Sequence, residues 1–232
     1  MAESRSPQKT PPAGLGAPDA ESDATALFDQ PWCADVSENE LVYAGAVWNI
    51  RRERFAYGAG ELRRDFMDHT GAVAIVAMDE NDGILVLRQY RHAVRLREWE
   101  LPAGLLDVDG ESALSCAQRE LAEEADLVAA EWKVLVDYCT SPGGSNEVVR
   151  VFVARGLTVA DKLHERTGEE SDMEVRWVSL DEARDAVLRG HVSNSIFIVA
   201  VLNAVAKRDL GWAHLGNADA PWPLRDWRVQ TA

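Results

Sequence analysis

Polar and apolar residues begin to alternate after the first forty residues of the chain. Residues 42–57 place apolar side chains between Arg-rich polar positions, and Gly58-Ala59-Gly60 separates them from a shorter stretch over 61–69. A period of two is typical of strands with one buried face. The pattern predicts an antiparallel hairpin, and a sheet this small needs further packing to be stable.

Continuous apolar runs follow this hairpin. Residues 72–78 and 84–87 flank Asn81-Asp82-Gly83, where Asp-Gly readily supplies a positive φ, so we predict a second hairpin. Three later runs also have the character of strands, at 132–139, 148–154 and 175–178.

Helical spacing occurs in three places. Residues 111–125 carry apolar side chains three and four positions apart, with Ser112 in a capping position. Ser179 opens a short predicted helix that ends at Gly190, and residues 194–209 form a strongly apolar one. Because strands precede, separate and follow these helices, we expect an α/β fold with a mixed sheet packed by helices.

The two ends of the chain differ from its middle. Residues 1–25 combine four prolines with small and acidic residues, so we expect a disordered tail. After this tail we predict a strand region over 40–70, a main domain over 71–210 and a C-terminal extension over 211–232. Trp222 and Trp227 of the extension are expected to pack against the body of the protein.

Composition narrows the class of protein. The 232 residues are 47% hydrophobic and 27% charged, and 39 Asp and Glu against 24 Lys and Arg give a net charge of -15. This charge would repel a nucleic-acid backbone, so no polymeric DNA or RNA partner is expected.

No apolar run reaches roughly 18 residues and the start lacks a secretory pattern, which predicts a cytoplasmic protein with no membrane partner. Three cysteines without C-x-x-C spacing indicate reduced thiols.

Glutamates crowd the predicted helix over 111–125. Glu120 and Glu124 lie one turn apart, so their charges repel by an amount on the order of a few tenths of a kcal/mol in a bare helix. Either solvent or oxygen-ligating cations such as Mg²⁺ can offset this repulsion, and the spacing alone leaves both explanations open. Upstream, Gly104 allows a tight backbone path on which the Ala103 carbonyl can join carboxylates around a metal.

The stretch from Gly104 to Leu127 resembles the signature of the Nudix hydrolases. After Gly104 and Glu111 it reads Arg119-Glu120-Leu121-Ala122-Glu123-Glu124-Ala125-Asp126-Leu127. Six residues rather than five separate Gly104 from Glu111, an insertion associated with the ADP-sugar branch of the family. Asp126 stands where the signature has Gly, which bears on how the helix ends and not on the metal ligands.

Two further segments are similar to the ADP-ribose pyrophosphatases within that family, and the resemblance extends over about residues 41–207. These segments are residues 99–107 and Ser141-Pro142-Gly143-Gly144-Ser145-Asn146-Glu147. The resemblance implies a mixed sheet sandwiched between helices, with a small antiparallel N-terminal sheet. It also implies Mg²⁺-dependent hydrolysis of ADP-ribose to AMP and ribose 5-phosphate, with Mn²⁺ as the alternative ion. The partner it implies is a second copy of the chain, in a homodimer that exchanges its N-terminal strands.

The same resemblance implies the metal ligands. Glu120 and Glu124 are expected to ligate the ion together with the Ala103 carbonyl. Glu111 or Glu123 completes the set, and Glu123 is also counted among the catalytic carboxylates.

The base that activates water is expected outside the signature. By resemblance it lies on the acidic segment 167–173, with Glu170 as first choice and Glu169 as second. From composition alone the same segment is a hydrophilic loop between strands. Arg119 is expected to orient the carboxylates as their ion-pair partner.

Phosphate contacts are implied for arginines. Arg91 aligns with a phosphate-contacting arginine of the family, and Arg63 or Arg64 is a further candidate. A guanidinium suits phosphate oxygens because its donors form a planar fork.

The remaining substrate contacts come from loops and aromatic residues. Glu147 corresponds to a residue that contacts the nucleoside, and Pro142, like Gly104, is expected to face the substrate. Trp48 or Tyr57 is available to stack on adenine, although either can equally pack in the core.

Two alternative functions stay open. The protein can prefer another nucleoside diphosphate sugar such as GDP-mannose, or it can be a non-catalytic nucleotide sensor with a Nudix fold. The intact Glu120, Glu123 and Glu124 argue against the sensor, because a binding domain does not need a crowded set of metal ligands. The five histidines share no ligand spacing and are assigned no role.

Overall fold

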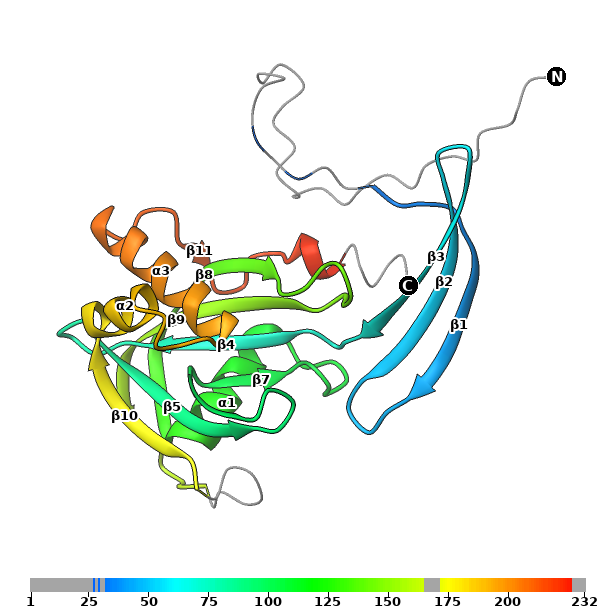
Figure 1. Cartoon of the computed structure of the whole chain (residues 1–232). Helices are drawn as coiled ribbons and strands as arrows, with labels where there is room; N and C mark the ends of the chain where they lie inside the picture. The colour runs from blue at the N-terminus through cyan, green and yellow to red at the C-terminus, as the bar shows by residue number, and fades with distance from the viewer. Residues whose placement is uncertain (1–26, 28, 30–31, 165–171, 227–232) are drawn as a thin grey trace. The chain divides into compact units, whose positions relative to one another are not determined.

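The computed structural model describes residues 32–164 and 172–226, together with Leu27 and Asp29 (Figure 1). The predicted tail, Glu169, Glu170 and Trp227 lie outside the described residues. Contacts divide the chain into two units. Unit 1 comprises the residues up to His69, the loop Ser141–Asn146 and the residues from Pro221 onward, and unit 2 comprises Thr70–Thr140 and Glu147–Ala220.

Unit 1 is built on a three-stranded antiparallel sheet in the order β1-β2-β3. The predicted first hairpin is confirmed as β2 and β3, which turn at Gly58 with a φ of 61°. The prediction of one continuous alternating segment from residue 42 to residue 57 was wrong, because the chain reverses direction after Ala44 and residues 42–44 belong to β1. Gly45 fits this turn because a Cβ on it would lie 2.2 Å from the Trp48 carbonyl oxygen. The strands are β1 (Val36–Ala44), β2 (Asn49–Tyr57) and β3 (Gly60–Asp68).

The loop Ser141–Asn146 pairs with the end of β3. The Met67 amide donates to the Gly144 carbonyl at 2.9 Å, and the Asn146 amide donates to the Met67 carbonyl at 3.2 Å. Unit 1 is therefore assembled from segments that lie far apart in the sequence.

Unit 2 contains two sheets, and the larger is mixed, as predicted. Its order is β11-β8-β9-β4-β7, in which β4 and β9 are parallel and the other neighbours are antiparallel. The smaller sheet has the order β10-β5-β6. The strands are β4 (Ala72–Ala77), β5 (Gly83–Arg91), β6 (Leu96–Glu100), β7 (Ala103–Leu105), β8 (Leu127–Cys139), β9 (Val148–Val159), β10 (Glu174–Ser179) and β11 (Gly216–Asn217).

The predicted second hairpin was wrong as a pairing. A tight turn does form, with the Asp79 amide donating to the Gly83 carbonyl and with Asp82 at a φ of 59°. However, β4 and β5 belong to different sheets and share only the isolated bridge between Met78 and Ile84. The reason is that β7 and β9 already occupy both edges of β4.

All three predicted helices are confirmed. Their N-caps are Ser112, Ser179 and Asn194, whose side chains each accept a backbone hydrogen bond from the first turn. Among the described residues, no helix has the length and apolar character needed to cross a membrane. The helices are α1 (Ala113–Ala125), α2 (Leu180–Leu188) and α3 (Ser195–Asp209).

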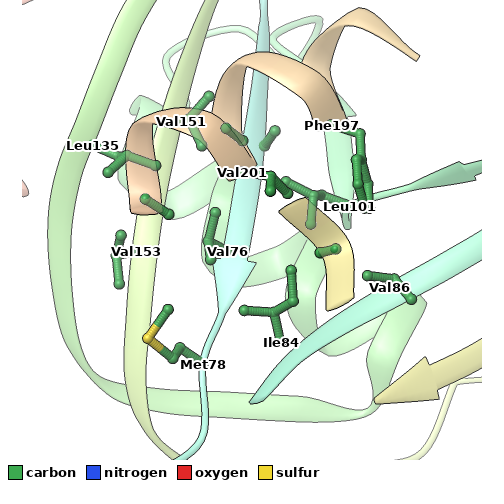
Figure 2. Packing of buried hydrophobic residues seen from close by; sticks show 14 of the residues in the cluster. Val76, Met78, Ile84, Val86, Leu101, Leu135, Val151, Val153, Phe197 and Val201 are labelled. Atoms are coloured by element: carbon green, nitrogen blue, oxygen red, sulfur yellow. The ribbon is translucent and has the colours of Figure 1, made fainter. Parts of the chain in front are cut away.

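The core of unit 2 lies on both faces of β4. On one face, Val76 joins Val151 of β9 and Phe197 and Val201 of α3 in an apolar cluster (Figure 2). The alternate residue Ile75 is also fully buried and points to the other face. Helix α1 contacts β4, β7 and β8, and its buried side chains are not part of the first cluster. The sheet is therefore covered by helices on two sides.

A buried ion pair joins β8 and β9. The Arg150 guanidinium donates from Nε and Nη2 to the two carboxylate oxygens of Asp137 at 2.8 Å each, and Nη1 donates to the Ala220 carbonyl at 2.7 Å. Only 4% of the Arg150 side chain is exposed. A guanidinium so buried depends on its carboxylate, because the charge cannot be solvated otherwise.

We predict that Asp137→Ala lowers the free energy of unfolding by about 3 kcal/mol, because it removes the carboxylate that accepts two hydrogen bonds from the buried Arg150 guanidinium. Urea denaturation measures this change. Glu182→Gln is the matched control, since it breaks an ion pair with Arg176 in which both side chains are about half exposed and should cost less than about 1 kcal/mol. Equal losses in the two variants would contradict the prediction.

Candidate active site

Strand β7, which lies between β6 and α1, brings backbone close to the acidic helix. The tight backbone path that we expected at Gly104 is a short strand, because Ala103 and Gly104 pair with β4. The Ile75 amide also donates to the Pro102 carbonyl at 2.8 Å. The Ala103 amide then donates to Glu124 Oε2 at 2.9 Å. Since Glu124 is buried, this bond places one carboxylate of α1 directly against β7.

Gly104 is required by close packing rather than by its φ. A Cβ on this residue would lie 2.0 Å from Glu120 Oε1 and 2.2 Å from Glu120 Cγ. Any other residue would displace the Glu120 side chain. Strand β7 and helix α1 therefore bring Ala103, Gly104, Glu120 and Glu124 together.

Arg119 holds three carboxylates at once. Its Nε and Nη2 donate to both oxygens of Glu111 at 3.0 Å, and its Nη1 donates to Glu120 at 2.6 Å and to Glu123 at 3.2 Å. The hydrogen bonds that Arg119 donates hold the pKa of Glu111 below its usual range, and the same bonds contribute most to raising the pKa of Arg119. Beneath them, burial together with the Glu120 charge raises the pKa of the Cys116 thiol to about 12.

The donor set of this site suits a hard divalent cation. Carboxylate and carbonyl oxygens are the ligands that Mg²⁺ and Mn²⁺ prefer, and Glu120 and Glu124 supply them from successive helical turns. No group of three Asp, Glu, His or Cys side chains converges on one point within the part of the chain that the structure describes. Three of the glutamates, Glu111, Glu120 and Glu123, are instead ion-paired with Arg119.

Arg91 stands at the end of β5, paired with a buried carboxylate. Its Nε and Nη2 donate to the two oxygens of Glu100 at 2.7 and 2.6 Å, and Gln89 Nε2 donates to the same carboxylate at 3.3 Å. Glu100 is 4% exposed, whereas 44% of the Arg91 side chain is exposed. The pairing fixes the guanidinium while leaving much of it accessible to solvent.

The other predicted substrate residues are divided between the two units. Glu147, in unit 2, accepts a hydrogen bond from the Thr140 hydroxyl at 2.6 Å. Pro142, Arg63 and Arg64 are exposed residues of unit 1. The guanidinium of Arg64 donates to the Arg63 carbonyl at 2.9 Å.

The two candidate stacking residues both contact another aromatic ring. Trp48 stacks on His69 with ring centroids 5.5 Å apart, and Tyr57 meets Trp32 edge to face at 5.9 Å. Both side chains keep about half of their surface exposed.

Unit 1 contains a pocket that sequence reasoning missed. Its volume is about 290 Å³, and Phe55 and Phe66 form aromatic parts of its wall beside Arg51, Glu53 and Asp68. Desolvation is the main cause that raises the pKa of Glu53 above its ordinary value. The signal was present in the sequence, because Arg51, Glu53 and Phe55 share one face of a strand at a spacing of two.

Comparison with known proteins is consistent with this geometry. A family model described as NUDIX domain matches residues 68–198. The chain belongs to the Nudix family. It is 46% identical over 185 residues to an ADP-ribose pyrophosphatase of Mycobacterium tuberculosis, covering 79% of this chain and 88% of that protein.

The chain is also similar to a relative with a different name and to a solved structure. A methanol dehydrogenase activator of Bacillus methanolicus is 29% identical over 167 residues, covering 71% of this chain and 88% of that protein. A crystal structure of an ADP compounds hydrolase matches with a TM-score of 0.65 at 17% identity, covering 80% of this chain and all of that one. The structural match shows a shared fold.

Asp126, which stands where the Nudix signature has glycine, is the C-cap of α1. It adopts the left-handed conformation, with a φ of 55° and a ψ of 33°, and its amide donates to the Ala122 carbonyl. Asp tolerates this conformation better than most residues because its short polar side chain can bond locally. Here Asp126 Oδ1 accepts the His164 amide at 2.9 Å, which a glycine could not do.

We predict that Gly104→Ala weakens Mn²⁺ binding about tenfold or more, because the new methyl group displaces the carboxylate of Glu120, which is expected to be a metal ligand. Isothermal calorimetry measures this affinity. Gly60→Ala is the control, because a Cβ there meets no atom within 4 Å. Unchanged Mn²⁺ affinity in Gly104→Ala would show that the close approach to Glu120 does not matter for the metal.

Proposed function

We propose that this Nudix protein hydrolyses the pyrophosphate bond of ADP-ribose to AMP and ribose 5-phosphate. The observation that carries the proposal is the packing of Glu120 and Glu124 against Ala103 and Gly104 of β7, inside a matched Nudix domain. The name of the M. tuberculosis relative supports ADP-ribose as the substrate.

Hydrolysis of a diphosphate requires neutralisation of its charge, a positioned water and a base. Glu120, Glu124 and the Ala103 carbonyl would hold a divalent cation, Mg²⁺ by preference and Mn²⁺ as the alternative. When bound, such an ion supplies positive charge against the phosphate oxygens and makes water more acidic. Arg119 holds Glu111 and Glu123 in fixed positions beside these ligands.

The base and the phosphate contact complete the proposed site. Glu170, or else Glu169, is proposed to accept the proton of the attacking water. Arg91 is proposed to bind a phosphate oxygen, and its bidentate pairing with Glu100 supports this role because it orients the guanidinium in advance. Arg63 or Arg64 remains a second proposed phosphate contact.

We assign the nucleoside to residues of the strand region and of the loop that precedes β9. The aromatic and charged walls of the unit 1 pocket suit a base, since two phenylalanines can flank a ring while Arg51 and Glu53 bond its edge. Glu147 is proposed as a further nucleoside contact. Pro142 in the preceding loop and Gly104 in β7 are proposed to face the substrate.

A homodimer, located in the cytoplasm, is part of the proposal. Strand β1 lies at the edge of its sheet and exposes Leu41, Val42 and Tyr43. An apolar edge of this kind supports pairing with a second copy of the chain.

We expect the purified protein with Mg²⁺ to convert ADP-ribose to AMP and ribose 5-phosphate, and a chelator to abolish the reaction. Chromatography of the products measures both results. GDP-mannose is the comparison substrate, because contacts outside the Nudix signature select the nucleotide. Rapid turnover of GDP-mannose without AMP formation from ADP-ribose would reject the substrate, and tight binding without any turnover would favour a sensor.

We predict that Glu124→Gln lowers kcat by about 100-fold or more while the protein stays folded, because the change removes charge from a proposed metal ligand but no core volume. Steady-state kinetics and circular dichroism measure the two effects. Glu131→Gln on β8 is the matched control, since this glutamate is exposed and outside the site. Near-normal kcat in Glu124→Gln would contradict the assigned role.

A further inference from the structure

Asn146 begins a chain of hydrogen bonds that runs along the unit 1 pocket. Its Oδ1 accepts the His69 amide at 2.8 Å, and its Nδ2 donates to Asp68 Oδ1 at 2.8 Å. Because a backbone amide can only donate, the His69 contact determines which end of the Asn146 side chain is the oxygen. The amino end is therefore directed at Asp68.

From Asp68 the chain continues to Glu53 through two more side chains. Asp68 Oδ2 accepts from Arg51 Nε at 2.7 Å, and Arg51 Nη1 donates to Asn39 Oδ1 at 2.9 Å. Asn39 Nδ2 then donates to Glu53 Oε1 at 2.9 Å. Every side chain in this series lines the pocket.

Donors and acceptors alternate without a break along the series. Each link orients the next, so the position of Arg51 and Glu53 depends on the bond between Asn146 and Asp68. None of these side chains is fully buried, and partly exposed hydrogen bonds contribute little to overall stability. The series is better suited to orienting polar groups than to holding the fold together.

We propose that Asn146 is a positioning residue for nucleoside recognition, acting through Asp68 to orient Arg51 and Glu53 toward the base. This inference rests on the proposed function. It assigns a role to the residue that directly precedes Glu147, although Asn146 belongs to unit 1. The ligand chemistry is a base whose edge carries both hydrogen-bond donors and acceptors.

The test exchanges the two partners of the first side-chain bond. Asn146→Asp places two carboxylates opposite each other, and Asp68→Asn replaces the carboxylate that accepts from Arg51 Nε. The double variant restores a donor opposite an acceptor. In it, the amide group introduced at position 68 can donate to the carboxylate introduced at position 146, and its oxygen can still accept from Arg51. We expect Asn146→Asp to raise the KM for ADP-ribose about tenfold with kcat within about twofold of wild type, and the double variant to recover to within about threefold.

A substrate without a base separates positioning from a general structural effect. The methyl ester of ribose 5-diphosphate keeps the bond to be cleaved, and its KM should be the same in Asn146→Asp and wild type. Ser37→Ala is the control in the same sheet, since it removes only a hydrogen bond to the Arg54 carbonyl, and its kinetics should match wild type.

If the wild type hydrolyses ADP-ribose, three results would reject the role of Asn146 and leave the proposed function intact. They are an unchanged KM for ADP-ribose in Asn146→Asp, an equal rise of KM with the base-free ester, and a double variant no better than Asn146→Asp. If the wild type does not hydrolyse ADP-ribose at all, the proposed function fails and the inference fails with it.

Discussion

The close approach of helix α1 to strand β7 at Ala103 and Gly104 is the constraint on which the candidate site depends. Two carboxylates one helical turn apart repel each other, and here each is held by the backbone of β7 or by a neighbouring side chain. Glu124 receives the Ala103 amide, and Glu120 occupies the space that a side chain at position 104 would fill. The N-cap at Ser112 and the left-handed Asp126 set where the helix begins and ends, so they also set the position of both carboxylates.

Local signals were sufficient to predict the helices, including the one that carries the glutamates of the candidate site. Caps and a spacing of three to four residues involve neighbours in sequence, so α1 could be located from Ser112 and the residues after it. Strand pairing is not local, which is why the turn at Asp82 suggested a hairpin that the two occupied edges of β4 exclude. The unit 1 pocket was missed for the same reason, because its lining comes from several segments, including Asn146 in a distant loop.

Arginine compensates the acidic character of the chain at specific points. With a net charge of -15, carboxylates have to be satisfied locally when they leave solvent. Arg119 serves three glutamates, whereas Arg91 and Arg150 each form a two-oxygen pair with one carboxylate. The first arrangement draws several negative groups together on α1, and the pair between Arg150 and Asp137 stabilises two strands of the core. The same planar guanidinium geometry thus orders the candidate site through Arg119 and stabilises the fold through Arg150.

The loop Ser141–Asn146 makes unit 1 discontinuous in sequence. A gene fragment that ends at His69 would encode β1, β2 and β3 but not the loop residues Gly144 and Asn146, which form hydrogen bonds with Met67. Recombination between relatives at that boundary would therefore separate a sheet from the hexapeptide that has to match it. The N-terminal region and this loop are expected to have changed together in evolution, and chimaeric proteins should inherit both from one parent.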